Sequence, residues 1–348
     1  MPELLRRLVN AVSPSGDEWA VREIVKKAIT PYVDEITTDT LGNLICHKKG
    51  KGQALGIAAH MDEVGLMVDR IDPDGYLKVA AIGGIDAITL VGQKVYILNN
   101  KNQIICNGVI TFEDIQNGEN PIDYQVPELE ELYVDIGLTK EQCAKKNIDV
   151  GCYVVPHHDY AYLGNKNIIS GKALDDRIGC YILIELARRL QNFNSNVYFI
   201  FTVQEEVGLY GAKTSIYNLD IDWGIAVDVV SANDGSLGMP RVLGEGPVIT
   251  IKDSAMIASR SINLHLEALA KKNKIPLQKE VTSTGTTDAL NIMLSKGGIA
   301  STVIGVAVRN IHSTVGIADL NDIDHTIELL YLLLKNQPVF EKPNGHRI

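Results

Sequence analysis

Cysteine pairs and long apolar runs are missing from this sequence, and each absence excludes a class of protein. The five cysteines are scattered and form no CxxC pair. This argues against a disulfide framework and against a thiolate metal site, and it favours reduced thiols in a cytoplasm. No apolar run approaches the roughly 20 residues that span a bilayer, and the N-terminal stretch predicts an amphipathic helix instead of a signal peptide. We therefore expect a cytoplasmic protein with no membrane partner.

Basic charge is also in short supply. Lys and Arg number 33 against 43 Asp and Glu, which gives a formal net charge of −10. Because affinity for nucleic acid depends on clustered Lys and Arg, we expect no nucleic-acid partner. The length of 348 residues exceeds what one hydrophobic core usually serves, so two domains are expected.

Two kinds of segment alternate along the chain. Residues 67–163 contain short β-prone runs separated by turns, with almost no helical period, and one of these runs is residues 88–98. Such a pattern predicts a small β-barrel or sandwich. Residues 1–66 and 164–348 instead alternate helical and strand patterns. The chain is therefore predicted to be an α/β protein with a β-rich domain inserted into a discontinuous first domain.

One buried strand ends in two carboxylates. The apolar run 197–203 changes abruptly to Gln204-Glu205-Glu206, at the end of a strand where α/β sheets bind ligands. Because neighbouring strand residues point to opposite sides, Glu205 and Glu206 are expected to do different jobs. One could ligate a metal while the other handles a proton. Taken alone, the pair would be read as a solvated acidic turn.

Four further strand ends or helix starts repeat this pattern. They carry His60 with Asp62, Asp175, Asp228 and His312. A single histidine would be read as a structural residue and a single aspartate as a helix cap. Five such sites at one sheet edge instead form a set of histidine and carboxylate ligands that suits Zn²⁺, Co²⁺ or Mn²⁺. A carboxylate bridging two ions is the usual core of a dinuclear hydrolytic site.

The motifs around these residues resemble the glutamyl aminopeptidase or tetrahedral aminopeptidase family of dinuclear metallopeptidases, some of whose members are labelled endoglucanase or cellulase. The matching stretches occur in the same order and span nearly the whole chain. They are Ala59-His-Met-Asp-Glu-Val-Gly65, Gly171-Lys-Ala-Leu-Asp-Asp-Arg177, Gln204-Glu-Glu-Val-Gly208, Val227-Asp228 and Ile311-His-Ser313. The family pattern differs at Gly285-Thr-Thr-Asp-Ala289 and at Asn310, which leaves the specificity open.

The resemblance implies a role for each residue. Asp175 matches the bridging carboxylate, His60 and Asp228 the other ligands of one metal, and Glu206 and His312 those of the second. Glu205 matches the general base, and Asp62 the carboxylate that orients His60. Two divalent ions per subunit are implied, Zn²⁺ or Co²⁺ before Mn²⁺.

The resemblance also implies an architecture and a partner. The catalytic domain, residues 1–66 and 164–348, would have the mixed central sheet sandwiched by helices of zinc peptidases. Residues 67–163 would be a β-barrel dimerisation domain, and dimers would assemble into a hollow tetrahedral dodecamer. The substrates would be short peptides.

Three other functions remain open. An endoglucanase would need two carboxylates flanking a sugar, with no role for the histidines. A carboxypeptidase or deacylase could use the same two metals. A catalytically silent binding protein would be expected to have lost a ligand or the base, and none is missing here.

Overall fold

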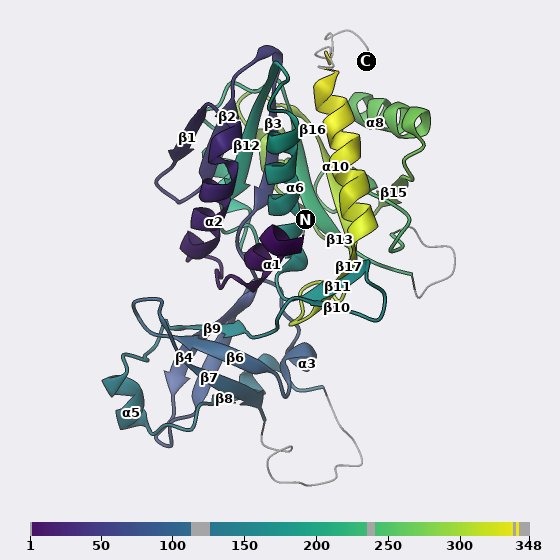
Figure 1. Cartoon of the computed structure of the whole chain (residues 1–348). Coiled ribbons are helices and arrows are strands. Elements are labelled where there is room, and N and C mark those ends of the chain that lie inside the picture. The colour runs from purple at the N-terminus through teal and green to yellow at the C-terminus, as the bar shows by residue number, and fades with distance from the viewer. Residues whose placement is uncertain (1, 113–125, 235–240, 337–338, 341–348) are drawn as a thin grey trace.

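The computed structural model describes residues 2–112, 126–234, 241–336 and 339–340. This part of the chain forms a large helix-covered sheet and a smaller barrel that projects from one end of it (Figure 1). The prediction of an α/β fold with a mixed central sheet and an inserted barrel is confirmed.

The large sheet is mixed, with a parallel centre. Its main path runs in the order β1-β2-β12-β3-β13-β16-β17-β11-β10, with β14 beside β16 and β15 beside β14. Strands β12, β3, β13 and β16 are parallel, and the outer strands pair antiparallel except β14 with β15. The strands are β1 (Glu35–Thr38), β2 (Leu44–Lys48), β3 (Lys51–His60), β10 (Ala161–Tyr162), β11 (Ile168–Gly171), β12 (Ser195–Thr202), β13 (Trp223–Ser231), β14 (Val248–Lys252), β15 (Gln278–Val281), β16 (Ala300–Arg309) and β17 (Gly316–Asp319).

Helices cover both faces of this sheet. Helices α1, α2, α6, α8 and α10 lie on one face, with α6 packed across β3 and β13 (Figure 1). Helix α9 lies on the other face, and α7 packs beside it. Their bounds are α1 (Pro2–Asn10), α2 (Trp19–Ile29), α6 (Leu174–Arg189), α7 (Tyr210–Ser215), α8 (Arg260–Asn273), α9 (Ala289–Leu294) and α10 (Leu320–Lys335), and a 3₁₀ turn η1 (Thr30–Tyr32) follows α2.

Side chains on the two faces of the sheet belong to different hydrophobic cores. Leu55, Ile57 and Ala59 of β3 join the main core under α6. Ala58 points the other way, into a smaller core with Ile292 of α9. This period-two alternation within a fully buried strand explains why its sequence is almost continuously apolar.

The barrel closes in the order β4-β5-β8-β7-β6-β9 and has its own apolar core. Its elements are β4 (Gly65–Ile71), β5 (Leu77–Ile82), α3 (Ala87–Leu90), β6 (Lys94–Leu98), β7 (Ile104–Thr111), η2 (Leu129–Glu131), β8 (Tyr133–Asp135), α5 (Lys140–Lys145) and β9 (Tyr153–Pro156).

Two details of the barrel differ from the sequence prediction. The expected strand at residues 88–98 begins only at Lys94, because Ala87–Leu90 forms a helical turn and Gly92 then has φ +75°. Helix α5 was not expected. Its Thr139 and Gln142 side chains cap the first turn reciprocally, which is a signal readable from the sequence.

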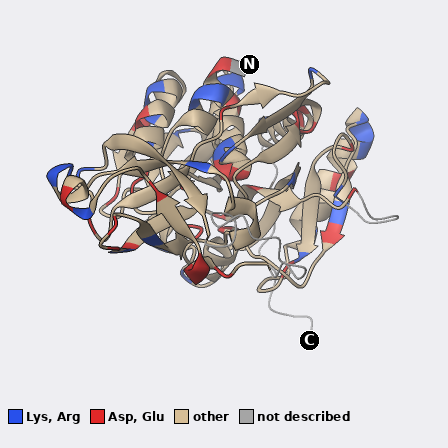
Figure 2. Ribbon diagram, turned by 90° about the horizontal axis from the view of Figure 1, so that it is seen from below, with Lys and Arg blue, Asp and Glu red and all other residues tan. Residues whose placement is uncertain are grey.

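Charged residues of both signs share the helices (Figure 2). Arg6 pairs with Glu3 on α1, and Arg188 pairs with Glu185 on α6, each three residues apart. Among the described residues, no helix combines the length and the apolar character needed to cross a membrane.

Candidate metal centre

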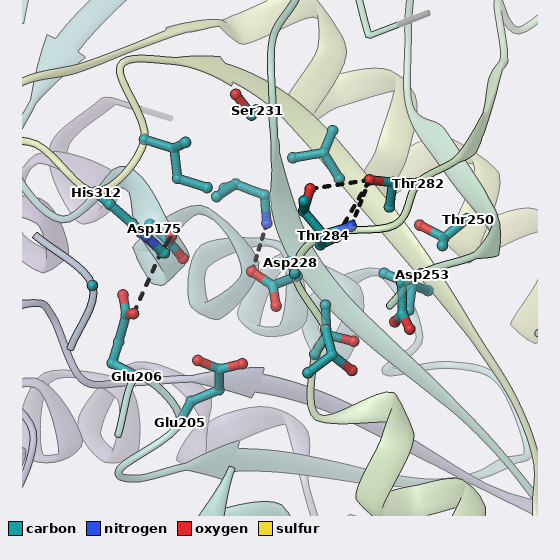
Figure 3. Close-up of a pocket in the computed structure, with 18 of the residues that line it drawn as sticks. Asp175, Glu205, Glu206, Asp228, Ser231, Thr250, Asp253, Thr282, Thr284 and His312 are labelled. Atoms are coloured by element: carbon teal, nitrogen blue, oxygen red, sulfur yellow. Dashed lines mark hydrogen bonds and ion pairs between the residues drawn. The ribbon is translucent and has the colours of Figure 1, made fainter. Parts of the chain in front are cut away.

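The parallel strands bring the predicted site residues to one edge of the sheet. His60 is the last residue of β3, and the adjacent strand β12 ends at Thr202, its register partner. Asp228 lies on β13, Asp175 at the start of α6, and His312 in the turn after β16. Figure 3 shows Asp175, Glu206 and His312 at one end of a pocket with Asp228 near its middle.

Asp175 lies between two groups of ligand atoms. Its Oδ1 is 2.9 Å from His60 Nε2, and its Oδ2 is 3.3 Å from His312 Nε2. His312 Nε2 is also 3.4 Å from Glu206 Oε2, and His60 Nε2 is 3.8 Å from Asp228 Oδ1. The two oxygens of one carboxylate thus face two different histidines, each with a second carboxylate beside it.

Two sets of three side chains have ligand atoms close enough to share an ion. One set is His60, Asp175 and Glu206, and the other is His60, Asp176 and Asp228, with all atoms of a set within 4.8 Å. Asp176 was not among the predicted ligands, although it follows Asp175 directly. Its Oδ1 accepts a hydrogen bond from Gly179 N, and its Oδ2 is buried without a partner.

Glu205 and Glu206 do not follow the alternation expected of a strand. β12 ends at Thr202, and Gln204 has φ +53°. The two carboxylates therefore leave from a turn and both line the pocket. The expectation that they point to opposite sides is wrong, because it assumed an extended backbone beyond the strand end.

Asp62 holds this turn in place. Its Oδ1 accepts a hydrogen bond from Glu205 N at 3.1 Å, and its Oδ2 accepts from Glu206 N at 3.2 Å and from Ser15 Oγ at 2.7 Å. His60 Nδ1 lies 3.5 Å from Asp62 Oδ1 and 3.2 Å from the Asp62 carbonyl oxygen. Asp62 thus contacts both His60 and the backbone that carries the two glutamates.

The site contains more buried acid than its own bases neutralise. Burial raises the pKa of Glu206 to about 8 and that of Asp228 to about 7, and nearby Asp175 adds to both shifts. Burial likewise raises the pKa of Glu205 well above its ordinary value. Burial acts on Asp175 in the same direction, but hydrogen bonds from His312 and His60 outweigh it and hold the pKa of Asp175 below its usual range.

The residues present fit divalent cations. Imidazole and carboxylate are the ligands that Zn²⁺ and related ions take. The buried Glu206 Oε1 has no hydrogen-bond partner, and buried polar atoms normally have one. Burial and the neighbouring carboxylate of Asp175 raise the pKa values of Glu206 and Asp228, and the charge of a bound cation would favour their ionised forms.

The pocket extends well beyond this cluster, with a volume of about 510 Å³. Figure 3 shows Thr250, Asp253, Thr282 and Thr284 at the end away from Glu206. A pocket of this size is in the range of small-molecule sites.

Sequence reasoning missed several residues at the site. Gly83 and Gly84, between β5 and α3, come so close that a Cβ on Gly83 would lie 3.1 Å from Glu206 Cβ, and one on Gly84 3.3 Å from His312 Nδ1. Asp288 is buried and accepts a hydrogen bond from Thr202 Oγ1. The sequence signals were the Gly83-Gly84 pair and the Gly285-Thr-Thr-Asp288 run before Ala289. Neither signal indicates which residues these positions contact.

Comparison with known proteins gives a consistent result. The profile of the M42 glutamyl aminopeptidase family matches residues 42–329. The lysyl aminopeptidase of Pyrococcus furiosus is 33% identical over 345 residues, which is 96% of this chain and 96% of the relative. The solved aminopeptidase APDkam598 of Desulfurococcus kamchatkensis has a TM-score of 0.90 at 37% identity, covering 96% of this chain and 94% of that one.

A second solved neighbour is named for its assembly. The TET1 peptidase of Pyrococcus horikoshii, described as assembling into a tetrahedron or a large octahedral shell, has a TM-score of 0.84 at 30% identity, covering 96% of this chain and 98% of that one. A structure named endoglucanase, from Thermotoga maritima, has a TM-score of 0.77 at 31% identity, covering 95% and 96% of the two chains.

Proposed function

Because the chain belongs to the M42 glutamyl aminopeptidase family, we propose that it releases N-terminal residues from short peptides by using two divalent metal ions. The family makes it a hydrolase acting on peptides. The observation that carries the two-metal proposal is the position of Asp175, whose two carboxylate oxygens lie 2.9 Å and 3.3 Å from two different imidazoles.

His60, Asp228 and one oxygen of Asp175 would hold one cation, and His312, Glu206 and the other oxygen would hold the second. Zn²⁺ or Co²⁺ suits these ligands best, and Mn²⁺ is acceptable. When bound, the ions supply Lewis acidity, which makes a water more acidic and stabilises negative charge in the transition state. Asp176, whose Oδ2 is free of partners, is the further carboxylate beside the first group.

Glu205 is the proposed general base. It lines the pocket beside the ligand cluster, and its backbone N–H is fixed by Asp62 Oδ1. From there its carboxylate takes the proton of the attacking water and passes it to the leaving amine. Glu206 Oε2 lies 3.4 Å from His312 Nε2, which favours a metal-ligand role for Glu206. Proton transfer is therefore assigned to Glu205.

Asp62 serves the reaction without touching the substrate. It is completely buried and accepts hydrogen bonds from the backbone of both glutamates. Through its contact with His60 Nδ1 it also orients the ring so that Nε2 faces Asp175. A carboxylate behind a metal-binding histidine commonly fixes the tautomer in this way.

Self-association is part of the proposal. The barrel would pair subunits, and the pairs would form a dodecamer, as the tetrahedral P. horikoshii neighbour suggests. The active sites would then face an interior that admits short or unfolded peptides. We place the protein in the cytoplasm, because all five cysteines are unpaired and reduced thiols are typical there.

The test is a set of substrates run on protein stripped by chelation and reloaded with Zn²⁺, Co²⁺ or Mn²⁺. Aminoacyl p-nitroanilides with free amino groups should be hydrolysed, whereas their N-acetylated forms should not. Hydrolysis of N-acetyl amino acids or of C-terminal residues would indicate a deacylase or carboxypeptidase, and release of reducing sugar from carboxymethylcellulose an endoglucanase. Any of these without aminopeptidase activity would refute the proposal.

A further inference from the structure

Three charged residues of the sequence motifs do not face the pocket. Glu63 and Lys172 each have 2% of their surface exposed, and Arg177 has none. Charged side chains are almost never this deeply buried unless they are paired. The proposed reaction gives none of them a role.

The three side chains form one hydrogen-bonded cluster. Lys172 Nζ donates to Glu63 Oε1 at 2.6 Å, to Oε2 at 2.5 Å and to the Ala11 carbonyl oxygen at 3.0 Å. Arg177 lies 3.5 Å from Glu63 Oε1 and donates to the carbonyl oxygens of Leu8 at 2.8 Å and Ser13 at 3.1 Å. Glu63 Oε1 also accepts from Ser13 N at 2.9 Å.

The cluster joins the two chain segments that carry His60 and Asp175. Glu63 follows His60 by three residues, and Lys172 precedes Asp175 by three. The sheet does not join these segments, because β3 and β11 are separated by β13, β16 and β17 in strand order. Strands in a sheet are about 4.8 Å apart, so the ladder alone leaves β3 and β11 well separated.

The barrel lies between these two segments in the chain sequence. Its strands run from Gly65 in β4 to Pro156 in β9, so the chain leaves for the barrel directly after Glu63 and is back from it before Lys172. Residues 60–63 and 172–175 therefore flank the part of the chain that runs through the barrel. The Glu63–Lys172 ion pair links these two flanking segments, next to the 2.9 Å contact between His60 and Asp175.

Stability is a poor reason for burying this pair. Taking two ions out of water is costly, and apolar replacements of buried ion pairs are often as stable or more so. The geometry points to a different role: Glu63 and Lys172 are positioning residues that fix the segment of His60 against that of Asp175, and so set the affinity of the site for divalent cations. This role rests on the proposed metal-dependent function. Arg177 anchors the pair to the backbone of residues 8–13.

Two variants separate positioning from stability. Lys172→Met leaves the Glu63 carboxylate buried without its main partner and should destabilise the protein. The double variant Glu63→Gln/Lys172→Met removes that charge and keeps an acceptor for Ser13 N, so much of the stability should return. Neither variant retains the ionic link between the two segments. We expect Co²⁺ to bind both about 10–100-fold more weakly than the parent, the range for residues that support metal ligands.

Calorimetric titration of Co²⁺ into the metal-free proteins measures this, with urea unfolding of the same samples as the stability readout. Arg189→Gln is the control, because it breaks the ion pair of Arg189 with Glu328 on the same helix α6 and should leave Co²⁺ affinity within about two-fold. If the double variant regains both stability and parental Co²⁺ affinity, the cluster is only structural and the inference is wrong. A parent that binds no Co²⁺ would instead refute the proposed function itself.

Discussion

Replacing Asp62 by asparagine tests how the catalytic turn is held. The substitution keeps the size of the side chain but exchanges one carboxylate oxygen for an NH₂ group. Asp62 Oδ1 and Oδ2 accept separate backbone N–H groups, those of Glu205 at 3.1 Å and Glu206 at 3.2 Å. An asparagine can accept only one of them, and its NH₂ would then face the other N–H, donor against donor.

The loss can be estimated from these contacts. A hydrogen bond to a charged group contributes about 1.5–3 kcal/mol, and a buried N–H left without a partner costs about 1–3 kcal/mol. We therefore expect the free energy of unfolding of Asp62→Asn to fall by about 2–4 kcal/mol. Displacement of the turn that carries Glu205 should lower kcat by a factor of about 10–100, as is usual when the support of a ligand or base is removed.

Asp322→Asn is the matched control. Asp322 is also completely buried, and its two oxygens accept the N–H groups of Gly244 and Gly246, each at 2.8 Å. It should lose similar stability in urea unfolding yet keep kcat on an aminoacyl p-nitroanilide within about three-fold. The reasoning about Asp62 fails if Asp62→Asn loses stability but keeps parental kcat, because the turn would then not depend on this carboxylate.

The remaining predictions concern the base, the metals and the assembly. Glu205→Gln should bind metal nearly as well as the parent in calorimetry but lose a factor of about 10²–10⁴ in kcat; full turnover in Glu205→Gln, with none in Glu206→Gln, would reverse the two roles. Metal binding at pH 7 should release protons, because the pKa of Glu206 is about 8 and that of Asp228 about 7 in the metal-free protein, and titrations in buffers of different ionisation enthalpy measure the number released. The raised pKa values of these two carboxyls favour the metal-free fold at low pH, and this contribution is lost as pH rises toward 8. The urea concentration at the midpoint of unfolding should therefore decrease as pH rises from about 5 to about 8. An increase over this range would contradict the inference that the site holds an excess of buried acid. Light scattering should give a mass near twelve times the 38.1 kDa of one chain, and a single species at the monomer mass excludes the assembly, whereas a dimer keeps the pairing role of the barrel and removes the cage.

The sequence predicted which residues lie near one another better than it predicted how they are held. Apolar runs that end abruptly in a charged residue revealed the ends of β3 and β12, because a buried strand must be apolar until it reaches the site. The closeness of His60 and Asp175 follows from that topology together with the motif match. The turn after Thr202 could not be foreseen, since the positive φ of Gln204 is unusual for a residue other than glycine or asparagine.

Contacts between distant segments account for the other omissions. Nothing near Gly83 in the sequence indicates that this part of the chain comes back from the barrel to lie against Glu206. Glu63 and Lys172 lie inside recognised motifs, but they are 109 residues apart. Their pairing depends on how the chain enters and leaves the barrel. Local sequence patterns predict strand ends and helix caps, whereas contacts between distant segments depend on the packing of the whole fold.

The buried acid also determines how folding and metal binding are linked. Asp175 stays ionised because two imidazoles donate to it, whereas the raised pKa values of Glu206 and Asp228 let these outer carboxyls keep protons near neutral pH. Protons on these carboxyls would reduce the negative charge of the site, so we expect the core under α6 and the closed barrel to form before any cation is bound. Cation binding would then be largely an exchange of ions for protons at a site whose framework exists already. This would differ from small zinc domains, in which the metal supplies the folding free energy itself, and we expect chelation to remove metal without unfolding the chain.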